Sequence, residues 1–263
     1  MRVELIFTVR GEGRMLPMDY QYALSSWVYG VIRQSDSDFS SFLHDRGYAD
    51  GNKRFKFFTV SELNLYPFKA WRERKVFEVL ENTFKVQLSF LVDRAYREFV
   101  KGLFLRQRGT LGDRFSRVEF EVTGIRSLAS PVFGEVMRYR SVSPLFLKVR
   151  EESGRVVHLS PEDKRYEDAL FGNLREKCRT LALHGEGEAV LEREDFGFRL
   201  LRTRGSRILR LHPYTEREIR NRVYHLDFEL RAPVAVQEVA YFAGLGADCS
   251  MGCGMLSVLD ESR

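Results

Sequence analysis

The sequence is poor in cysteine and has no long apolar run, and each absence excludes a class of protein. Its three cysteines, Cys178, Cys249 and Cys253, are too few and too unevenly spaced for a disulfide framework. They form no second close pair and have no neighbouring histidine, which argues against a zinc site. No apolar stretch approaches the roughly 20 residues of a membrane-spanning helix. The opening residues are too charged for a secretory leader, so we expect a cytoplasmic protein without membrane association.

The composition that remains is that of a folded protein with a mildly basic balance. The 263 residues suffice for one large domain or two of about 130 residues each. A hydrophobic content of 44% with 13% aromatic residues is typical of a chain that forms a core. The net charge of +5 permits an anionic partner without requiring one. The charge is uneven, because the segment Arg199–Arg222 holds eight arginines and no lysine.

Periodicity in the first half predicts alternating strands and helices. The predicted strands are Val3–Val9, Phe55–Leu65, Val76–Leu80, Phe84–Leu91 and Val118–Ile125. The predicted helices are Asp19–Arg33, Phe39–Asp45 and Asp93–Arg106. We expect a tight turn between the strands Val76–Leu80 and Phe84–Leu91. The order is close to the β-α-β-β-α-β order of a ferredoxin-like unit with an insertion.

The second half repeats this order. We expect a strand over 135–149, a helix over 160–178 capped by Ser160, a hairpin over 196–212 that turns at Arg204–Ser206, a strand over 222–232, a helix over 233–244 and a strand over 253–259. The sequence therefore predicts an α+β protein of two tandem ferredoxin-like (RRM-like) domains, residues 1–128 and 129–263. Each would have an antiparallel sheet with helices on one face. The prediction rests on the order of elements, because the halves share no visible identity.

The segment GLGADCSMGCGML, Gly244–Leu256, places four glycines in eleven positions. It fails the dinucleotide pattern G-x-G-x-x-G, because Cys249 occupies the third glycine position and the segment follows a helix instead of opening one. It is not a P-loop, because no Gly-Lys-Ser/Thr follows. The simplest alternative is a helix C-cap at Gly244 and a turn into a last strand.

These glycines belong to a wider resemblance. A C-terminal G-h-G, a short polar loop and a G-h-G-M leading into a final strand resemble the glycine-rich motif of the RAMP superfamily of CRISPR-associated proteins. Four further segments resemble the family of endoribonucleases that process CRISPR repeat RNA: LPMDYQYALSSWVYGVI, FSSFLHDRGY, FKFFTVSEL and SVSPLFLKV. The matches follow the order of that family over nearly the whole chain.

The resemblance implies two ferredoxin-like domains, CRISPR repeat RNA as partner, no cofactor and no metal. It implies cleavage by the 2′-hydroxyl beside the scissile phosphate, which leaves a 2′,3′-cyclic phosphate and a 5′-hydroxyl. The family positions for a tyrosine, a histidine and a lysine correspond to Tyr29, His44 and Lys56, with Lys53 and Arg54 as alternatives to the lysine. Contacts with effector-complex subunits and a homodimer are left open.

Helix geometry is consistent with exposure of two of these side chains. At about 100° per residue, Tyr29 lies about 60° beyond the apolar arc of its helix, and His44 lies about 100° past the apolar side of its own. The remaining histidines, His158, His184, His212 and His225, have no visible partner in the sequence, and we expect them to be structural.

RNA contacts are expected from arginines and from the glycine-rich segment. Arg199, Arg202, Arg204, Arg207 and Arg210 surround the predicted turn, where they could reach a phosphate backbone. The glycines Gly244, Gly246, Gly252 and Gly254 could bring main-chain N–H groups to phosphates, or hold the segment between the domains where RNA would lie. The competing interpretations are a solvated ribbon, a non-catalytic CRISPR RNA-binding scaffold subunit, and a small-molecule enzyme or ligand-binding protein.

Overall fold

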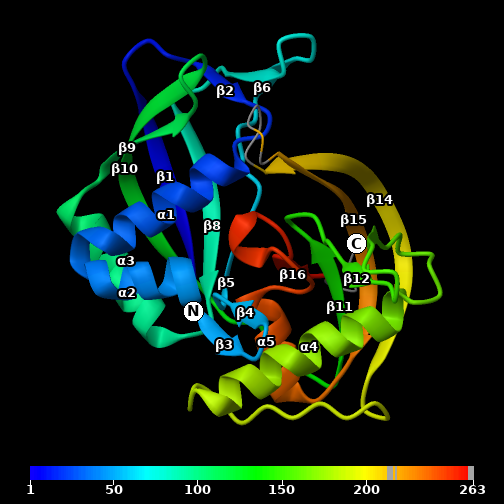
Figure 1. The fold of residues 1–263 in the computed structure, drawn as a ribbon. Helices are drawn as coiled ribbons and strands as arrows, with labels where there is room; N and C mark the ends of the chain where they lie inside the picture. Colours follow the sequence, from blue (N-terminus) through cyan, green and yellow to red (C-terminus); the bar gives the residue numbers. More distant parts are fainter. Residues whose placement is uncertain (212–215, 217, 260–263) are drawn as a thin grey trace.

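Two antiparallel sheets, one from each half of the chain, organise the computed structural model, which describes residues 1–211, 216 and 218–259. Figure 1 shows the two sheets side by side, with α1, α2 and α3 over the first and α4 beside the second. No helix in these described ranges has the length and apolar composition needed to cross a membrane.

The first half forms a five-stranded sheet in the order β5-β8-β1-β10-β9. Its elements are β1 (Arg2–Arg10), α1 (Gln21–Ser35), α2 (Ser37–Ser41), a π-helical turn (Phe42–Arg46), β5 (Phe58–Val60), β8 (Thr83–Phe90), α3 (Asp93–Leu105), β9 (Arg108–Gly112) and β10 (Arg117–Leu128). Without β9 at its edge, the sheet has the strand order of a ferredoxin-like unit. Val3, Leu5, Phe7 and Val9 of β1 are buried at every second position, as expected for a strand with one face in the core.

The segment between β5 and β8 differs from the prediction. The strand β7 (Val76–Val79) does not pair with β8 but lies between β2 (Met15–Pro17) and β6 (Phe68–Trp71) in a separate three-stranded sheet. The expected long strand Phe55–Leu65 is divided: β4 (Lys53–Phe55) pairs with β3 (Tyr48–Asp50), and only β5 joins the main sheet.

The second half has the sheet order β14-β15-β11-β16, which is again ferredoxin-like and confirms the predicted fold class. Its elements are β11 (Val136–Ser141), β12 (Lys148–Arg150), β13 (Val156–His158), α4 (Tyr166–Leu183), β14 (Gly197–Leu211), β15 (Ile219–Arg231), α5 (Val234–Ala243), a 3-10 turn (Cys249–Met251) and β16 (Leu256–Val258). The expected strand over 135–149 is two strands, since β12 pairs with β13.

Two local predictions in this half are wrong. The helix α4 begins at Tyr166 without a side-chain cap, and Ser160 instead bonds to Glu162 in the preceding turn. The predicted hairpin turn at Arg204–Ser206 lies inside β14, which pairs with β15 along its whole length. The register shifts between Leu200 and Arg202 and again between Thr203 and Gly205, so glycine here marks a bulge.

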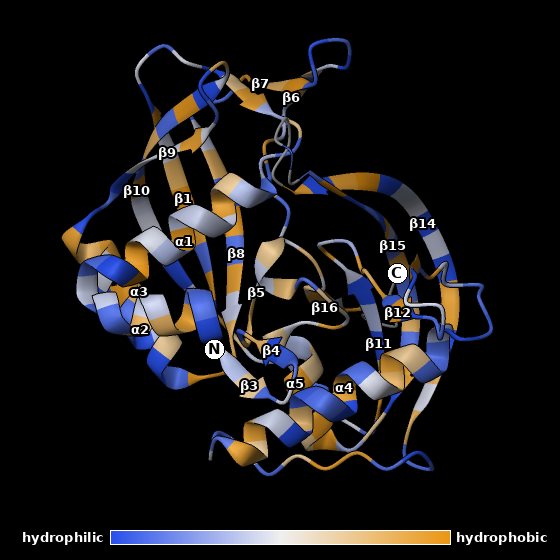
Figure 2. Ribbon diagram, in the orientation of Figure 1, coloured by the Kyte–Doolittle hydropathy of each residue, from blue (hydrophilic) through white to orange (hydrophobic). Residues whose placement is uncertain are grey.

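The halves are joined through a continuous core. Figure 2 shows apolar residues concentrated on the strands of the first sheet and on α5. Buried Arg2 of β1 crosses to the second half, where it donates to the carbonyls of Leu256 at 2.6 Å and Tyr241 at 2.8 Å. Its guanidinium also lies 3.7 Å from the centroid of the Tyr241 ring. The first and last strands are therefore held together by direct contacts.

Candidate active site

The three predicted catalytic side chains line one cavity of about 530 Å³ together with the glycine-rich segment. Tyr29, His44 and Lys56 come from the first half of the chain. The second half contributes Lys148, Lys177 and the segment 246–251. The cavity therefore requires both ferredoxin-like units.

His44 lies in the π-helical turn after α2, with 64% of its side chain exposed. Its Nδ1 is 2.7 Å from Oδ1 of Asp45, and this hydrogen bond holds the pKa of Asp45 below its usual value. An ionised carboxylate only accepts, so Nδ1 carries the proton that is donated to Asp45. In neutral His44 the lone pair is consequently on Nε2, which is the nitrogen free to accept a proton.

Tyr29 lies against His44 from the middle of α1. The two ring centroids are 5.1 Å apart and the rings meet edge to face, while Phe58 contacts the tyrosine at 5.5 Å in the same manner. Burial raises the pKa of Tyr29 to about 12, although a hydrogen bond with Ser250 acts in the opposite direction. The phenol is therefore protonated at neutral pH and acts as a hydrogen-bond donor.

Lys56 is the lysine in direct contact with the histidine turn. Its Nζ donates to the carbonyl oxygens of Leu43 and His44, the second at 2.6 Å. Burial, with the nearby positive charge of Arg54, lowers the pKa of Lys56 to about 8. The two alternative cations, Lys53 and Arg54, also line the cavity. However, Lys53 pairs with Glu176 at 3.1 Å, and Arg54 donates to the carbonyl of Asp45.

The glycine-rich segment lies between the two halves, packed against protein on both sides. Gly244, Gly246, Gly252 and Gly254 are buried and have φ between +79° and +86°. A Cβ on Gly244 would come within 3.0 Å of Thr59 in β5, and one on Gly252 within 2.9 Å of Gln21 in α1. Gly252 and Gly254 donate their N–H groups to carbonyls within the protein, which occupies the donors that the phosphate hypothesis needs at these positions.

Sequence analysis missed Lys177, the residue that holds this segment in place. Lys177 extends from α4, is 3% exposed, and donates to the carbonyls of Gly244 at 2.5 Å and Gly246 at 2.9 Å. Its third contact is Sγ of Cys249 at 3.3 Å, which satisfies all three ammonium N–H groups. A signal was present, because Lys177 follows the buried Leu174 by three positions on one helix face.

The predicted RNA-binding arginines lie along β14 instead of around a turn, and most are paired with carboxylates. Arg199 pairs with Glu229 at 2.8 Å, and Arg204 pairs with Asp227 at 2.9 Å. Arg202 is exposed and lies opposite Asp227 in the strand register. Much of the expected positive charge is therefore balanced within the sheet.

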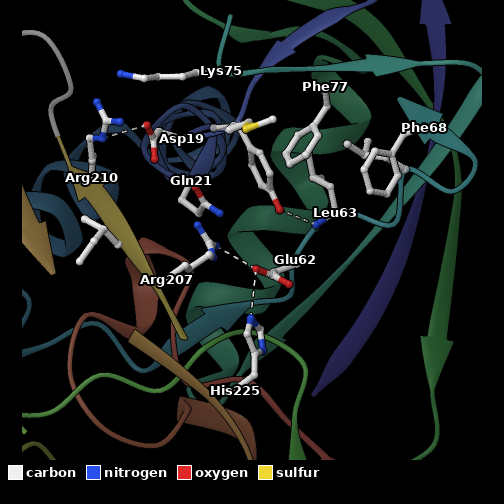
Figure 3. A pocket seen from close by; sticks show the side chains of 14 residues that line it. Asp19, Gln21, Glu62, Leu63, Phe68, Lys75, Phe77, Arg207, Arg210 and His225 are labelled. Atoms are coloured by element: carbon white, nitrogen blue, oxygen red, sulfur yellow. Dashed lines mark hydrogen bonds and ion pairs between the residues drawn. The ribbon is translucent and has the colours of Figure 1, made fainter. Parts of the chain in front are cut away.

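Arg207 and Arg210 reach across to the first half, at a second cavity of about 540 Å³. Figure 3 shows Arg207 and His225 pointing toward Glu62, at 2.8 and 3.5 Å, and Arg210 pointing toward Asp19, at 3.6 Å. Burial acts to raise the pKa of Glu62, but the hydrogen bonds from His225 and Arg207 outweigh it and hold the pKa below its usual value. The facing wall is apolar and includes Leu63, Phe68 and Phe77.

The other histidines have structural contacts. His184 bonds to the carbonyl of Ala49 and packs edge to face on Tyr48, and His158 packs on Phe146. His212 lies outside the described residues. Within the described part of the chain, no three side chains of histidine, cysteine, aspartate or glutamate gather closely enough to hold a metal ion.

Comparisons with known proteins agree over both halves. The model of CRISPR-associated protein Cas6, N-terminal, matches residues 15–126, and that of CRISPR associated protein Cas6, C-terminal, matches residues 128–258. The curated CRISPR-associated endoribonuclease Cas6 1 of Methanocaldococcus jannaschii is 26% identical over 270 residues, which cover 100% of this chain and 94% of the relative.

Solved structures show the same fold over the full length. A Cas6-related protein from Pyrococcus furiosus matches with a TM-score of 0.79 at 20% identity, covering 100% of this chain and 99% of that one. A structure described as an RAMP protein binding different RNA substrates matches with a TM-score of 0.78 at 19% identity, covering 99% of this chain and 100% of that one. These likenesses bear on the fold alone, and they agree with the tandem ferredoxin-like arrangement.

Proposed function

Because the chain belongs to the Cas6 family of CRISPR-associated proteins, we propose that it is an endoribonuclease that binds CRISPR repeat RNA and cleaves the precursor transcript within the repeats. The observation that carries the proposal is the single cavity lined by Tyr29, His44 and Lys56. The Methanocaldococcus jannaschii relative is named an endoribonuclease, which supports the same activity.

In the proposed reaction His44 is the general base. Its Nε2 takes the proton of the 2′-hydroxyl, whose oxygen attacks the adjacent phosphorus while the bond from phosphorus to the 5′-oxygen breaks. The products are a 2′,3′-cyclic phosphate and, after solvent water protonates the leaving oxygen, a 5′-hydroxyl; the proton on His44 then returns to solvent. Asp45 orients the ring and stabilises the imidazolium that forms, because it already accepts from Nδ1.

Tyr29 and Lys56 have different roles in this proposal. The Tyr29 hydroxyl is protonated at neutral pH, so it orients the 2′-hydroxyl or the phosphate by donating a hydrogen bond. Lys56 supplies positive charge for the pentacovalent phosphorane, where charge stabilisation contributes most. No cofactor or metal ion takes part.

RNA binding is proposed along β14 and at the glycine-rich segment. Arg202 is exposed, and Arg207 and Arg210, each paired with a carboxylate, lie opposite the apolar wall that holds Phe68 and Phe77 in the second cavity. Guanidinium groups that face aromatic rings suit a single strand, since phosphates accept from the N–H groups left over by the ion pairs and bases stack on the rings. The glycine-rich segment contributes by shaping the catalytic cavity between the halves, the second of the two roles predicted for it.

The test is incubation with a precursor RNA that contains the host's own repeat. We expect a gel shift and site-specific cleavage that persists in EDTA, with products that carry cyclic phosphate and 5′-hydroxyl ends. Binding without cleavage would instead support the scaffold subunit. Absence of any RNA-dependent shift would support a small-molecule enzyme, and loss of activity in EDTA would contradict the metal-free mechanism.

The rate of cleavage is expected to fall as the pH rises above about 8, because Lys56 then loses its proton. A lysine is cationic below its pKa, so stabilisation of the phosphorane is present well below pH 8 and declines as the pH rises through about 8. The measurement is kcat/KM against pH, which reports the pKa values of the free enzyme. In a Lys56→Arg variant the alkaline limb should move to higher pH; an unmoved limb would assign it to another group.

A further inference from the structure

A second basic hollow lies on the first half of the chain, between α1 and β9. It has a volume of about 460 Å³, and a neighbouring hollow of about 430 Å³ shares Arg106, Arg108, Gly109 and Thr110 with it. We call this continuous surface the α1–β9 groove. In Figure 1, β9 is at the edge of the first sheet beside α1, on the side away from α4 and β14.

The groove has more guanidinium groups than carboxylates. Arg33 and Arg106 are exposed and form no ion pair with any residue that the structure describes. Arg108 is 80% exposed and lies 3.5 Å from Glu121, whose carboxylate is already 2.9 Å from Arg10. The arginines of β14 differ, because most of them have a close carboxylate of their own.

The floor of the groove also offers a hydrogen-bond donor. Trp27 is half-buried there, and its indole Nε1 has no acceptor among the described residues. Gly109 passes so close that a Cβ at this position would be 2.8 Å from Nε1 and 2.7 Å from the ring of Phe120. The glycine keeps the floor open beside an aromatic N–H, which can donate a hydrogen bond to an oxygen of a base or sugar.

The position of Arg33 connects the groove with the catalytic cavity. Arg33 follows Tyr29 by four residues on α1, so the two side chains are one turn apart on the same side of the helix. Four residues rise about 6 Å along a helix axis. A strand that leaves the cavity past Tyr29 toward the C-terminal end of α1 therefore comes to Arg33.

We propose that the α1–β9 groove binds the phosphodiester backbone of the single RNA strand that adjoins the scissile phosphate. A guanidinium group without a carboxylate partner can donate two parallel hydrogen bonds to the oxygens of one phosphate. Each phosphate that is neutralised in this way releases counterions from the RNA. This inference rests on the proposed function, since it extends the same RNA away from the cavity. The groove contributes uniform binding energy and takes no part in bond breaking.

The test compares wild type with the double variant Arg33→Ala/Arg106→Ala. The probe is a fluorescent precursor RNA with 2′-deoxyribose throughout the repeat, which keeps every phosphate but removes the nucleophile. The double variant should bind on the order of tenfold more weakly and lower the slope of log Kd against log salt by about 1.4, or 0.7 per phosphate contact. With cleavable RNA, KM should rise while kcat is unchanged.

The control is Arg155→Ala/Arg175→Ala, which removes the same charge from exposed sites in the second half. It should bind as wild type does, and both double variants should keep the wild-type unfolding temperature. The proposal is overturned if the groove variant keeps the wild-type affinity and slope, or if the control loses as much. A wild type that binds RNA without cleaving it overturns only the proposed function, and one that binds no RNA overturns both.

Discussion

A His44→Ala variant is expected to cleave repeat RNA about 10²–10⁴-fold more slowly than wild type, the usual contribution of a general base. Its affinity for RNA should be nearly unchanged, because the imidazole acts on the 2′-hydroxyl during the reaction. Its stability should also change little, within about 0.5 kcal/mol, since 64% of the side chain is exposed. Single-turnover cleavage with excess protein measures the chemical step directly.

The matched control for this experiment is His184→Ala. His184 is an exposed histidine outside the catalytic cavity, bonded to the carbonyl of Ala49. It should cleave at the wild-type rate. Retention of full activity in His44→Ala would remove His44 from the mechanism, and an equal loss in His184→Ala would indicate a general effect of the substitution on folding.

A Gly254→Ala variant is expected to lose about 3 kcal/mol or more of its free energy of unfolding. Alanine at φ +79° costs on the order of 1 kcal/mol in backbone strain, and the added Cβ would also be pressed against the carbonyl of Leu245 and Sγ of Cys249. The carbonyl belongs to buried backbone, and the sulfur is held by Lys177 and by the carbonyl of Gly246, so neither can move aside cheaply. Cleavage should fall with stability, because the segment lines the catalytic cavity.

Gly154→Ala separates strain from crowding. Gly154 has almost the same φ, +82°, but a Cβ there would meet nothing within 4 Å. This variant should lose only about 1 kcal/mol and remain active. Urea unfolding of both variants gives the difference. Equal losses would show that the glycine-rich segment is constrained by backbone conformation alone and is not tightly packed between the halves.

The elements that could be predicted from the sequence are those specified by local pattern. The alternation in Val3–Val9 predicted β1. The apolar arc of α1 placed Tyr29 away from the core, but the tyrosine is half-buried and packs on Phe58 of β5. Gly205 led to the wrong prediction of a hairpin turn, because a glycine beside serine is typical of both a turn and a bulge. Only the pairing of β14 with β15 distinguishes the two, and that pairing involves residues distant in the sequence.

The candidate site was also predicted only in part, because contacts between residues distant in the sequence are not visible in local pattern. Resemblance indicated Tyr29, His44 and Lys56, and the fold brings them to one cavity. The ion pairs that balance the β14 arginines could not be anticipated, because Glu62 and Asp19 are more than a hundred residues away in the chain. Lys177 was overlooked because a lysine is expected at the surface. Here three acceptors satisfy its ammonium group and offset the cost of removing it from water.

The contact between the first and last strands has a consequence during protein synthesis. Arg2 and its acceptor at Leu256 are separated by 254 positions in the sequence, so Arg2 is synthesised long before Leu256. Until β16 emerges, this guanidinium has no partner there and the wall of the cavity formed by residues 246–251 is absent. A nascent chain that already displays Tyr29, His44 and Lys56 therefore lacks one wall of the candidate cavity until residues 246–251 have been synthesised.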